Sequence, residues 1–311
     1  MRVCSLMPAA TEIVGALGLA DSLVAVTHEC DYPPCVRGLP VVTRDRVSSR
    51  ASMGEIDRAV REETENGRSL YTLDLEEIEV LRPDLIVTQA LCGVCAVSED
   101  EVRAAACMLP DAPRVLNLEP MTLREVFGSM RAVAGAAGID GEKFVQSLEA
   151  RVERVVTSVS GRARPRVALL EWLDPPFSAG HWNPELVRLA GGVDGLGQKG
   201  QPSRTLAWND VTALKPEVIV IACCGFGVGR TLEEASLLKN VPGWMDLPAV
   251  RSHRVYVVDG SAYFSRPGPR LVDSLELLAH LLHPDAVRRP EGVVPLARLR
   301  SDSFADVSST P

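Results

Sequence analysis

The feature that most constrains the fold is a segment that occurs twice, once in each half of the chain. Residues 75–93 read LEEIEVLRPDLIVTQALCG, and residues 208–225 read WNDVTALKPEVIVIACCG. In each copy an amphipathic helical pattern reaches a proline, a continuous apolar run follows, and a cysteine and a glycine close the segment. Proline ends a helix, and such an apolar run is typical of a strand buried on both faces of a parallel sheet. The repeat therefore predicts two similar α/β lobes whose strand ends face each other across a cleft.

The pattern of the remaining segments extends this prediction to the whole chain. Strands and helices alternate through both halves, which indicates parallel sheets. The boundaries that we expect are an N-terminal lobe over 1–118, connecting helices over 119–162, a C-terminal lobe over 163–284 and a tail over 285–311. The helical pattern over 140–160 predicts one helix about 30 Å long. The predicted fold class is thus α/β, with two Rossmann-like lobes joined by a single long helix.

Length, charge and composition exclude several classes of protein. A chain of 311 residues is long enough for two domains, and 46% apolar and 24% charged residues are ordinary globular values. The net charge of −8 argues against nucleic-acid and anionic-membrane partners. No apolar run is long enough to span a membrane. Glu12 interrupts the apolar residues near the N-terminus, so we expect no signal peptide and a cytoplasmic protein, or a periplasmic one if a leader precedes Met1.

Unusual side chains follow the predicted strands of both halves. Ligands of open parallel sheets bind beyond the carboxyl ends of the strands, so we expect these residues to line one shared site. Aromatic rings there offer flat apolar surface to a planar chelate, and Arg266 offers a partner for an anionic or carbonyl group. The alternative is that these loops only close the lobes. The candidate ligand-binding residues are His28, Glu29, Cys30, Cys92, Cys95, Phe177, His181, Trp182, Trp208, Cys224, Phe226, Tyr263, Phe264 and Arg266.

The cysteines leave the question of a metal open. The pair Cys92 and Cys95 has no second C-x-x-C partner, which excludes a zinc ribbon. Ligation of a soft metal or a cobalt centre is one interpretation, and thiols without metal are the favoured one. We expect Cys4 and Cys107 to be core residues. The candidate metal ligands are His28, Cys30, Cys92, Cys95, His181 and Cys224.

Several catalytic and nucleotide-binding motifs are absent from the sequence. It contains no G-x-S-x-G, H-E-x-x-H or P-loop motif. We therefore expect a binding protein, and no catalytic residue is predicted. The alternative is a cytosolic metal-binding protein or an enzyme that uses the cluster of histidines and cysteines.

Five stretches together resemble a known family. They are SLMPAATEIVGALG (5–18), THECDYPP (27–34), QALCGVCAVS (89–98), EWLDPPFSAGHWNPELVRLAGG (171–192) and DGSAYFSRPGPRLVD (259–273). In this order they resemble cobalamin-binding proteins of the iron-siderophore/cobalamin class of ABC transporter substrate-binding proteins, over residues 1–284. The resemblance implies the class III substrate-binding-protein fold and non-catalytic binding of a corrinoid or related metal chelate. The protein would act in an importer or as a cytosolic carrier or sensor.

The resemblance also implies a protein partner and shows two departures. Members of the family dock on an ABC permease through one acidic residue in each lobe. Glu76 occupies the first position, whereas Asn209 occupies the second and Asp210 follows it. The sequence His28-Glu29-Cys30 stands where the best-known members carry a loop that contains tyrosine.

Overall fold

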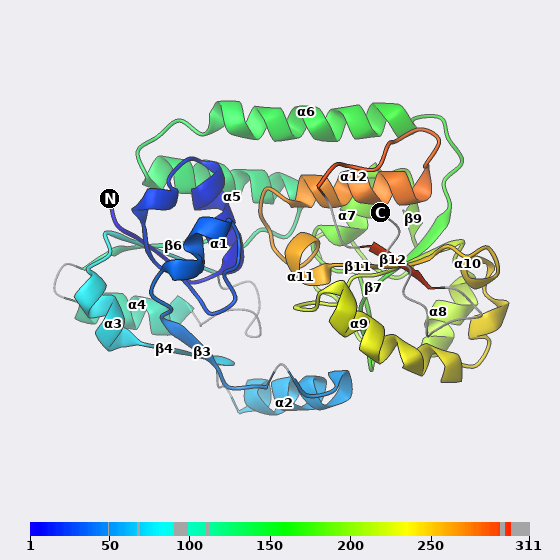
Figure 1. Ribbon diagram of the computed structural model, residues 1–311, viewed down its shortest axis with the longest axis horizontal. Coiled ribbons are helices and arrows are strands. Elements are labelled where there is room, and N and C mark those ends of the chain that lie inside the picture. The colour runs from blue at the N-terminus through cyan, green and yellow to red at the C-terminus, as the bar shows by residue number, and fades with distance from the viewer. Residues whose placement is uncertain (49, 67–68, 90–98, 110–111, 293–295, 300–311) are drawn as a thin grey trace. The chain divides into compact units, whose positions relative to one another are not determined.

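The computed structural model describes residues 1–48, 50–66, 69–89, 99–109, 112–292 and 296–299 (Figure 1). The chain forms two compact units. Unit 1 contains residues 1–51, 55–120 and 124–147, and unit 2 contains residues 52–54, 121–123 and 148–311. The long helix α6 (Glu142–Val159) carries the chain from unit 1 into unit 2. Its 18 residues correspond to a length of about 27 Å, so the prediction of a single long helix is confirmed.

Unit 1 is built on a four-stranded parallel sheet with strand order β2-β1-β5-β6. These strands are β1 (Val3–Ser5), β2 (Leu23–Ala25), β5 (Leu85–Thr88) and β6 (Arg114–Asn117). The helices are α1 (Pro8–Ala16), α2 (Met53–Glu65), α3 (Leu75–Leu81), α4 (Glu99–Met108) and α5 (Leu123–Ala136). All four residues of β5 are buried, as expected for a central strand covered on both faces. A separate antiparallel pair joins β3 (Thr43–Asp45) to β4 (Tyr71–Leu73).

Unit 2 is built on a larger mixed sheet with strand order β12-β11-β10-β7-β8, in which β9 also pairs with β7. The parallel strands are β7 (Arg166–Leu173), β9 (Val193–Asp194), β10 (Val218–Ile221) and β11 (Val255–Val258). The antiparallel strands are β8 (Pro176–Ser178) and β12 (Leu296–Leu299). The helices are α7 (Asn183–Leu189), α8 (Trp208–Leu214), α9 (Val228–Glu234), α10 (Pro248–Arg251), α11 (Gly260–Tyr263) and α12 (Leu271–Leu282). Strand β12 lies in the stretch for which the sequence predicted only a tail.

Ion pairs join α6 to each unit. In unit 1, Arg131 of α5 donates to both carboxylate oxygens of Glu142, the first residue of α6, at 2.8 and 3.0 Å. In unit 2, Arg151 in the second half of α6 donates to both oxygens of Glu276 at 2.9 and 2.7 Å and to Asp273 at 2.5 Å. Two-point pairing between a guanidinium and a carboxylate restricts orientation as well as distance. Each half of the helix is therefore held by ion pairs within its own unit.

One difference from the sequence expectations concerns a cysteine. Cys107 is exposed, so its expected place in the core is wrong. It follows buried Ala106 on α4, and a helix turns by about 100° per residue, which directs Cys107 away from the core. Cys4 is buried as expected. Within the described residues, no helix has the length and apolar character needed to cross a membrane.

Candidate functional site

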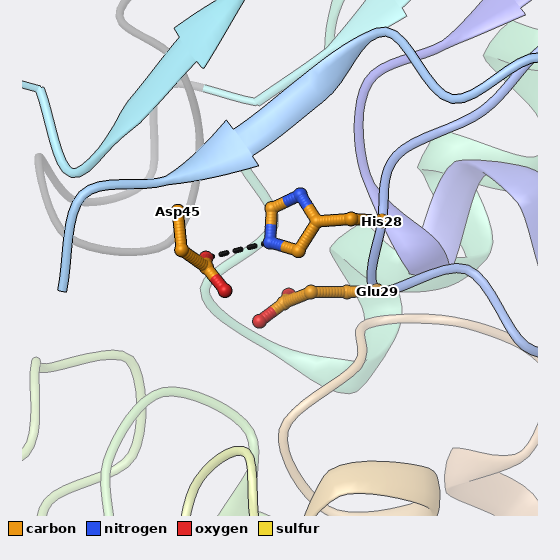
Figure 2. A group of neighbouring side chains, drawn as sticks. All are labelled: His28, Glu29 and Asp45. Carbon is orange, nitrogen blue, oxygen red and sulfur yellow. Dashed lines mark hydrogen bonds and ion pairs between the residues drawn. The ribbon is translucent and has the colours of Figure 1, made fainter. Parts of the chain in front are cut away.

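In unit 1 the structure gathers polar side chains beyond the end of β2. His28 and Glu29 lie in the loop after this strand, and Thr43 and Asp45 belong to β3. The imidazole Nδ1 of His28 is 2.7 Å from Thr43 Oγ1, and Nε2 is 2.6 Å from Asp45 Oδ1. The ring of Tyr71 on β4 is 5.4 Å from the imidazole, and its hydroxyl donates to Glu29 Oε1 at 3.5 Å. The strand pair β3–β4 therefore fixes the imidazole while two carboxylates flank it (Figure 2).

Cys30 follows Glu29 in the chain, and two threonine hydroxyl groups lie beside its thiol. Its Sγ is 3.1 Å from Thr11 Oγ1 on α1 and 3.1 Å from Thr27 Oγ1. The residue is half-buried and forms no disulfide with another cysteine of the described residues. Two hydroxyl groups beside a thiol stabilise it by hydrogen bonds, as they would stabilise a thiolate. The other predicted cysteines of this half, Cys92 and Cys95, lie outside the described residues, so their proposed approach to Cys30 stays a prediction.

In unit 2 a carboxyl group organises the loop that follows β8. Glu171 of β7 accepts hydrogen bonds at Oε1 from the backbone N–H of Gly180 at 2.9 Å and from Asn183 Nδ2 at 2.7 Å. Burial raises the pKa of Glu171 to about 7, although bonds from Asn183, Gly180 and Ser203 act in the opposite direction. Gly180 is required here, because a Cβ would lie 2.2 Å from the backbone nitrogen of Ser203. The residues from 180 to 183 are therefore fixed to the strand β7 and to the loop at 201–203.

His181 sits in this fixed loop with a strained backbone and a buried ring nitrogen. Its φ is +53°, a left-handed conformation that costs energy for a residue with a side chain. Its backbone N–H donates to Gln201 and its carbonyl accepts from Gly200. Within the described residues, the buried Nε2 of His181 has no hydrogen-bond partner. Burial lowers the pKa of His181, so its imidazole is neutral at pH 7.

The predicted aromatic residues of unit 2 divide into buried and accessible ones. Phe264 is fully buried and Trp182 is 3% exposed, and the indole Nε1 of Trp182 donates to the Phe264 carbonyl at 2.9 Å. Phe226 is also buried, between the Trp172 ring at 5.1 Å and the Arg230 guanidinium at 4.8 Å. These three rings lie in the core of unit 2. The partly accessible aromatic candidates are Phe177, Trp208 and Tyr263.

The remaining predicted residues of unit 2 have distinct environments. Cys224 is exposed, whereas its neighbour Cys223 is buried, and burial raises the pKa of the Cys223 thiol. Arg266 is buried and donates to Ser261 Oγ at 3.3 Å. The guanidinium of Arg270 lies 5.3 Å from the centre of the Tyr263 ring and holds it in place.

The two copies of the repeat present their predicted docking residues in the same place. Glu76 and Asn209 are both exposed at the second position of their helices, α3 and α8. Asp210 is also exposed, but its Oδ2 accepts a hydrogen bond from the backbone N–H of Ala207 at 2.9 Å. The Asp210 carboxylate therefore caps its own helix. It is equivalent in position to Glu77, and Asn209 is the equivalent of Glu76.

Sequence reasoning missed the residues that β3 and β4 contribute. Asp45 and Tyr71 are Cα partners in this antiparallel pair, and both contact the loop at 28–29. The segment Thr43-Arg44-Asp45 has no apolar alternation, so nothing in it signals a strand. Asn183 was likewise missed, because a single amide beside a proline carries no motif.

Comparison with known proteins identifies the family. The sequence profile of the family described as periplasmic binding protein matches residues 3–262. A vitamin B12-binding protein of Vibrio cholerae is 25% identical over 281 residues, covering 88% of this chain and 86% of the relative.

Solved structures share the fold. A periplasmic vitamin B12-binding protein of Vibrio cholerae superposes with a TM-score of 0.64 at 22% identity, covering 91% of this chain and 96% of that one. A periplasmic heme-binding protein of Pseudomonas aeruginosa superposes with a TM-score of 0.70 at 20% identity, covering 96% of this chain and 99% of that one. The predicted α/β class with two lobes is confirmed by these structures. With most of its length matched by the family profile, the chain belongs to the periplasmic binding protein family.

Proposed function

We propose that the protein is the substrate-binding component of an ABC importer and that it binds a corrinoid or a related metal chelate without chemical conversion. The observation that carries the proposal is the 25% identity, over most of both chains, to a protein named for vitamin B12 binding. The similar folds that are named for vitamin B12 and for heme support the same broad class of ligand, a large metal-bearing macrocycle.

His181 supports this class of ligand on chemical grounds. A neutral imidazole is a good ligand for cobalt and iron, and burial keeps His181 neutral. Its Nε2 is buried without a partner in the described part of the chain, which is costly unless a ligand completes it. The strained backbone at φ +53° fits a residue whose position serves binding.

We propose that the accessible side chains among the predicted residues contact the ligand. In unit 1 these are His28, Glu29 and Cys30, and in unit 2 they are Phe177, His181, Trp208, Cys224 and Tyr263. The buried Trp182, Phe226 and Phe264 act indirectly, by fixing the loops that carry these groups. Cys92 and Cys95 stay candidates from the sequence alone.

The family assignment also bears on location and partners. Its members are named as periplasmic, which favours the extracytoplasmic alternative and lends no support to a cytoplasmic protein or to a cytosolic enzyme. We propose docking on an ABC permease through α3 and α8. Glu76 brings a negative charge to this contact, whereas the equivalent Asn209 brings none. The variant Asn209→Glu would supply the missing negative charge and strengthen docking on the permease.

Titration with aquocobalamin, cobinamide and hemin tests the function. We expect saturable binding of one molecule of a corrinoid per chain, with Kd in the micromolar range or tighter, and a shift of the corrinoid absorbance bands. The absence of calorimetric binding for all three compounds would contradict the proposed function. Binding of hemin alone would retain the importer role and replace the corrinoid by heme.

A matched pair of variants tests the role of His181. His181→Asn removes the imidazole and suits the left-handed backbone, since asparagine tolerates positive φ. The control is His253→Asn, at an exposed histidine with φ +54°. We expect at least a tenfold loss of affinity and loss of the absorbance shift for His181→Asn only. Equal behaviour of the two variants would show that His181 does not bind the metal of the chelate.

A further inference from the structure

The side chains of His28, Glu29 and Asp45 form a compact group of potential metal ligands in unit 1. One ligand atom from each of the three lies within 4.8 Å of the other two. Figure 2 shows the His28 Nε2 edge and both carboxylates directed toward the same space. From this geometry we propose that the three residues bind a divalent transition-metal ion, with Zn²⁺ as the representative. His28 and Glu29 are also among the proposed contacts of the chelate, but this site binds an ion by itself and needs no chelate.

The hydrogen bond on the far side of the imidazole favours a metal ligand. Thr43 Oγ1 is 2.7 Å from His28 Nδ1, on the opposite edge of the ring from the carboxylates. Metal-binding histidines are commonly held in this way by a hydrogen bond to the second ring nitrogen. In the tautomer in which Nδ1 donates its proton to Thr43, the lone pair of Nε2 faces the Asp45 carboxylate and is available to a metal ion.

The distances define the small movement that metal loading requires. Zn²⁺ bonds of about 2.0–2.2 Å at a tetrahedral angle hold two ligand atoms about 3.4 Å apart. His28 Nε2 and Asp45 Oδ1 are 2.6 Å apart, so loading moves the carboxylate outward by roughly 0.8 Å. The Asp45 side chain is 38% exposed, and a rotation of its carboxylate supplies this movement. The His28 side chain is 21% exposed and keeps its place against Thr43.

The strand pair β3–β4 positions the ligands. Asp45 and Tyr71 are paired residues of the two strands, so the carboxylate and the phenol project from neighbouring backbone positions. The Tyr71 ring lies beside the imidazole and its hydroxyl reaches Glu29 Oε1. Tyr71 is therefore a positioning residue, since it contacts two of the three ligands and is not one itself.

The donor set selects the class of metal. One imidazole nitrogen and two carboxylates combine a ligand suited to Zn²⁺, Fe²⁺ or Co²⁺ with the charge needed to neutralise a divalent cation. Mg²⁺ and Ca²⁺ prefer oxygen ligands throughout and do not use the imidazole. Three protein ligands leave at least one coordination position for water or another small ligand.

Metal titration of the full chain, freed of metal by a chelator and without any corrinoid or heme, tests this proposal. We expect one Zn²⁺ per chain by calorimetry and by elemental analysis after dialysis. His28→Asn and Asp45→Asn should each weaken Zn²⁺ binding at least about 100-fold, and Tyr71→Phe by about tenfold. The variant His253→Asn, which removes an exposed imidazole of unit 2, should bind as the parent does. Less than stoichiometric zinc, or equal binding by His28→Asn and the parent, would overturn the proposal.

Co²⁺ spectroscopy separates this site from a thiolate site. Co²⁺ bound by nitrogen and oxygen alone gives weak visible bands, whereas cysteine ligands add an intense charge-transfer band in the near ultraviolet. We expect no such band, and unchanged Co²⁺ binding in the double variant Cys92→Ser, Cys95→Ser. A thiolate band that disappears in this double variant would place the metal on the cysteines and overturn the proposal. Circular dichroism of each variant checks the fold, and failure of corrinoid binding leaves the zinc result unaffected.

Discussion

The described parts of the two copies of the repeated segment, residues 75–89 and 208–222, have the same secondary structure but carry different exposed side chains. Helices α3 and α8 each have seven residues and each ends in a left-handed residue, Arg82 with φ +44° and Lys215 with φ +50°. Each is followed by a proline and by a four-residue strand with every residue buried.

Even the connection to the neighbouring strand is repeated. In unit 1 the backbone N–H of Arg2 donates to Asp84, and its side chain donates to the Leu81 carbonyl. In unit 2 the backbone N–H of Arg166 donates to Glu217, and its side chain donates to the Lys215 carbonyl. The equivalent pairs hold the strands β1–β5 and β7–β10 in the same register. The comparison teaches that the helix and strand scaffold is common to both units, whereas exposed residues on it, such as Glu76 and Asn209, differ.

The largest expected effect comes from the buried residues that the two repeats share. Ile78 of α3 and Val211 of α8 occupy equivalent positions and are 2% and 0% exposed. We expect Ile78→Ala to lower the free energy of unfolding by about 2–5 kcal/mol, and Val211→Ala by about 1 kcal/mol less, because valine loses one methylene fewer.

Two probes follow these variants separately in the two units. All four tryptophans lie in unit 2, so fluorescence reports that unit and circular dichroism reports both. Urea unfolding should show a smaller shift of the fluorescence transition for Ile78→Ala than for Val211→Ala. A larger fluorescence shift for Ile78→Ala would show that the two units unfold together and not separately.

The next effect sharpens the difference between the units. In unit 2 the partly buried carboxyl of Glu171 lies on β7, whereas the described strands β1, β2, β5 and β6 of unit 1 carry no carboxyl. The pKa of Glu171 is about 7 in the folded state and about 4.5 when unfolded. Between these values the folded protein retains a proton that the unfolded chain has lost. The Glu171 contribution to stability is therefore fully present below pH 4.5, falls as the pH rises and is lost above pH 7. The total change in the free energy of unfolding is roughly 3 kcal/mol.

The variant Glu171→Gln keeps a carbonyl for Gly180 and Asn183 but cannot ionise. We expect its stability relative to the parent to rise by up to about 3 kcal/mol between pH 4.5 and pH 8, measured by urea unfolding followed by fluorescence. A relative stability that does not change with pH would show that Glu171 is ionised normally in the folded protein.

The smallest effect concerns the helix starts of the two repeats. Asp74 precedes α3 and accepts from the backbone N–H of Glu77 at 3.1 Å, whereas α8 follows Ala207 and relies on Asp210. We expect Asp74→Ala to lower the unfolding free energy by about 1 kcal/mol and Asp210→Ala by less, since only Asp74 occupies the capping position itself. Thermal unfolding measures both. A larger loss for Asp210→Ala than for Asp74→Ala would show that the Asp210 carboxylate stabilises its helix more than the Asp74 cap does.

The apolar pattern predicted most of the secondary structure and failed at short antiparallel strands. The helix α6 lies within two residues of its predicted range of 140–160, and α3 and α8 form the helical part of the repeat, because a continuous helical period identifies each of them. The strands β3, β4, β8 and β12 were missed. Each has three or four residues, and each is defined by a partner strand and not by its own sequence.

The candidate site was predicted in part for the same reason. The loop with His28 and Glu29 was located from its place after a strand, but Asp45 contacts His28 from 17 residues away and was not. Among the aromatic residues, Phe264 carries the same sequence signal as Tyr263, yet one ring is buried and the other partly accessible. Adjacent residues point in different directions, and only packing decides which side faces the core.

The sequence by itself determined the two α/β units, the long helix between them in the chain, and the family. These depend on local periodicity and on a repeat that is visible in the linear sequence. The tertiary structure decided that His28 meets Asp45, that Glu171 holds the loop of His181, and which rings are buried. Those contacts join residues that are distant along the chain, and their energies arise only when burial brings the groups together.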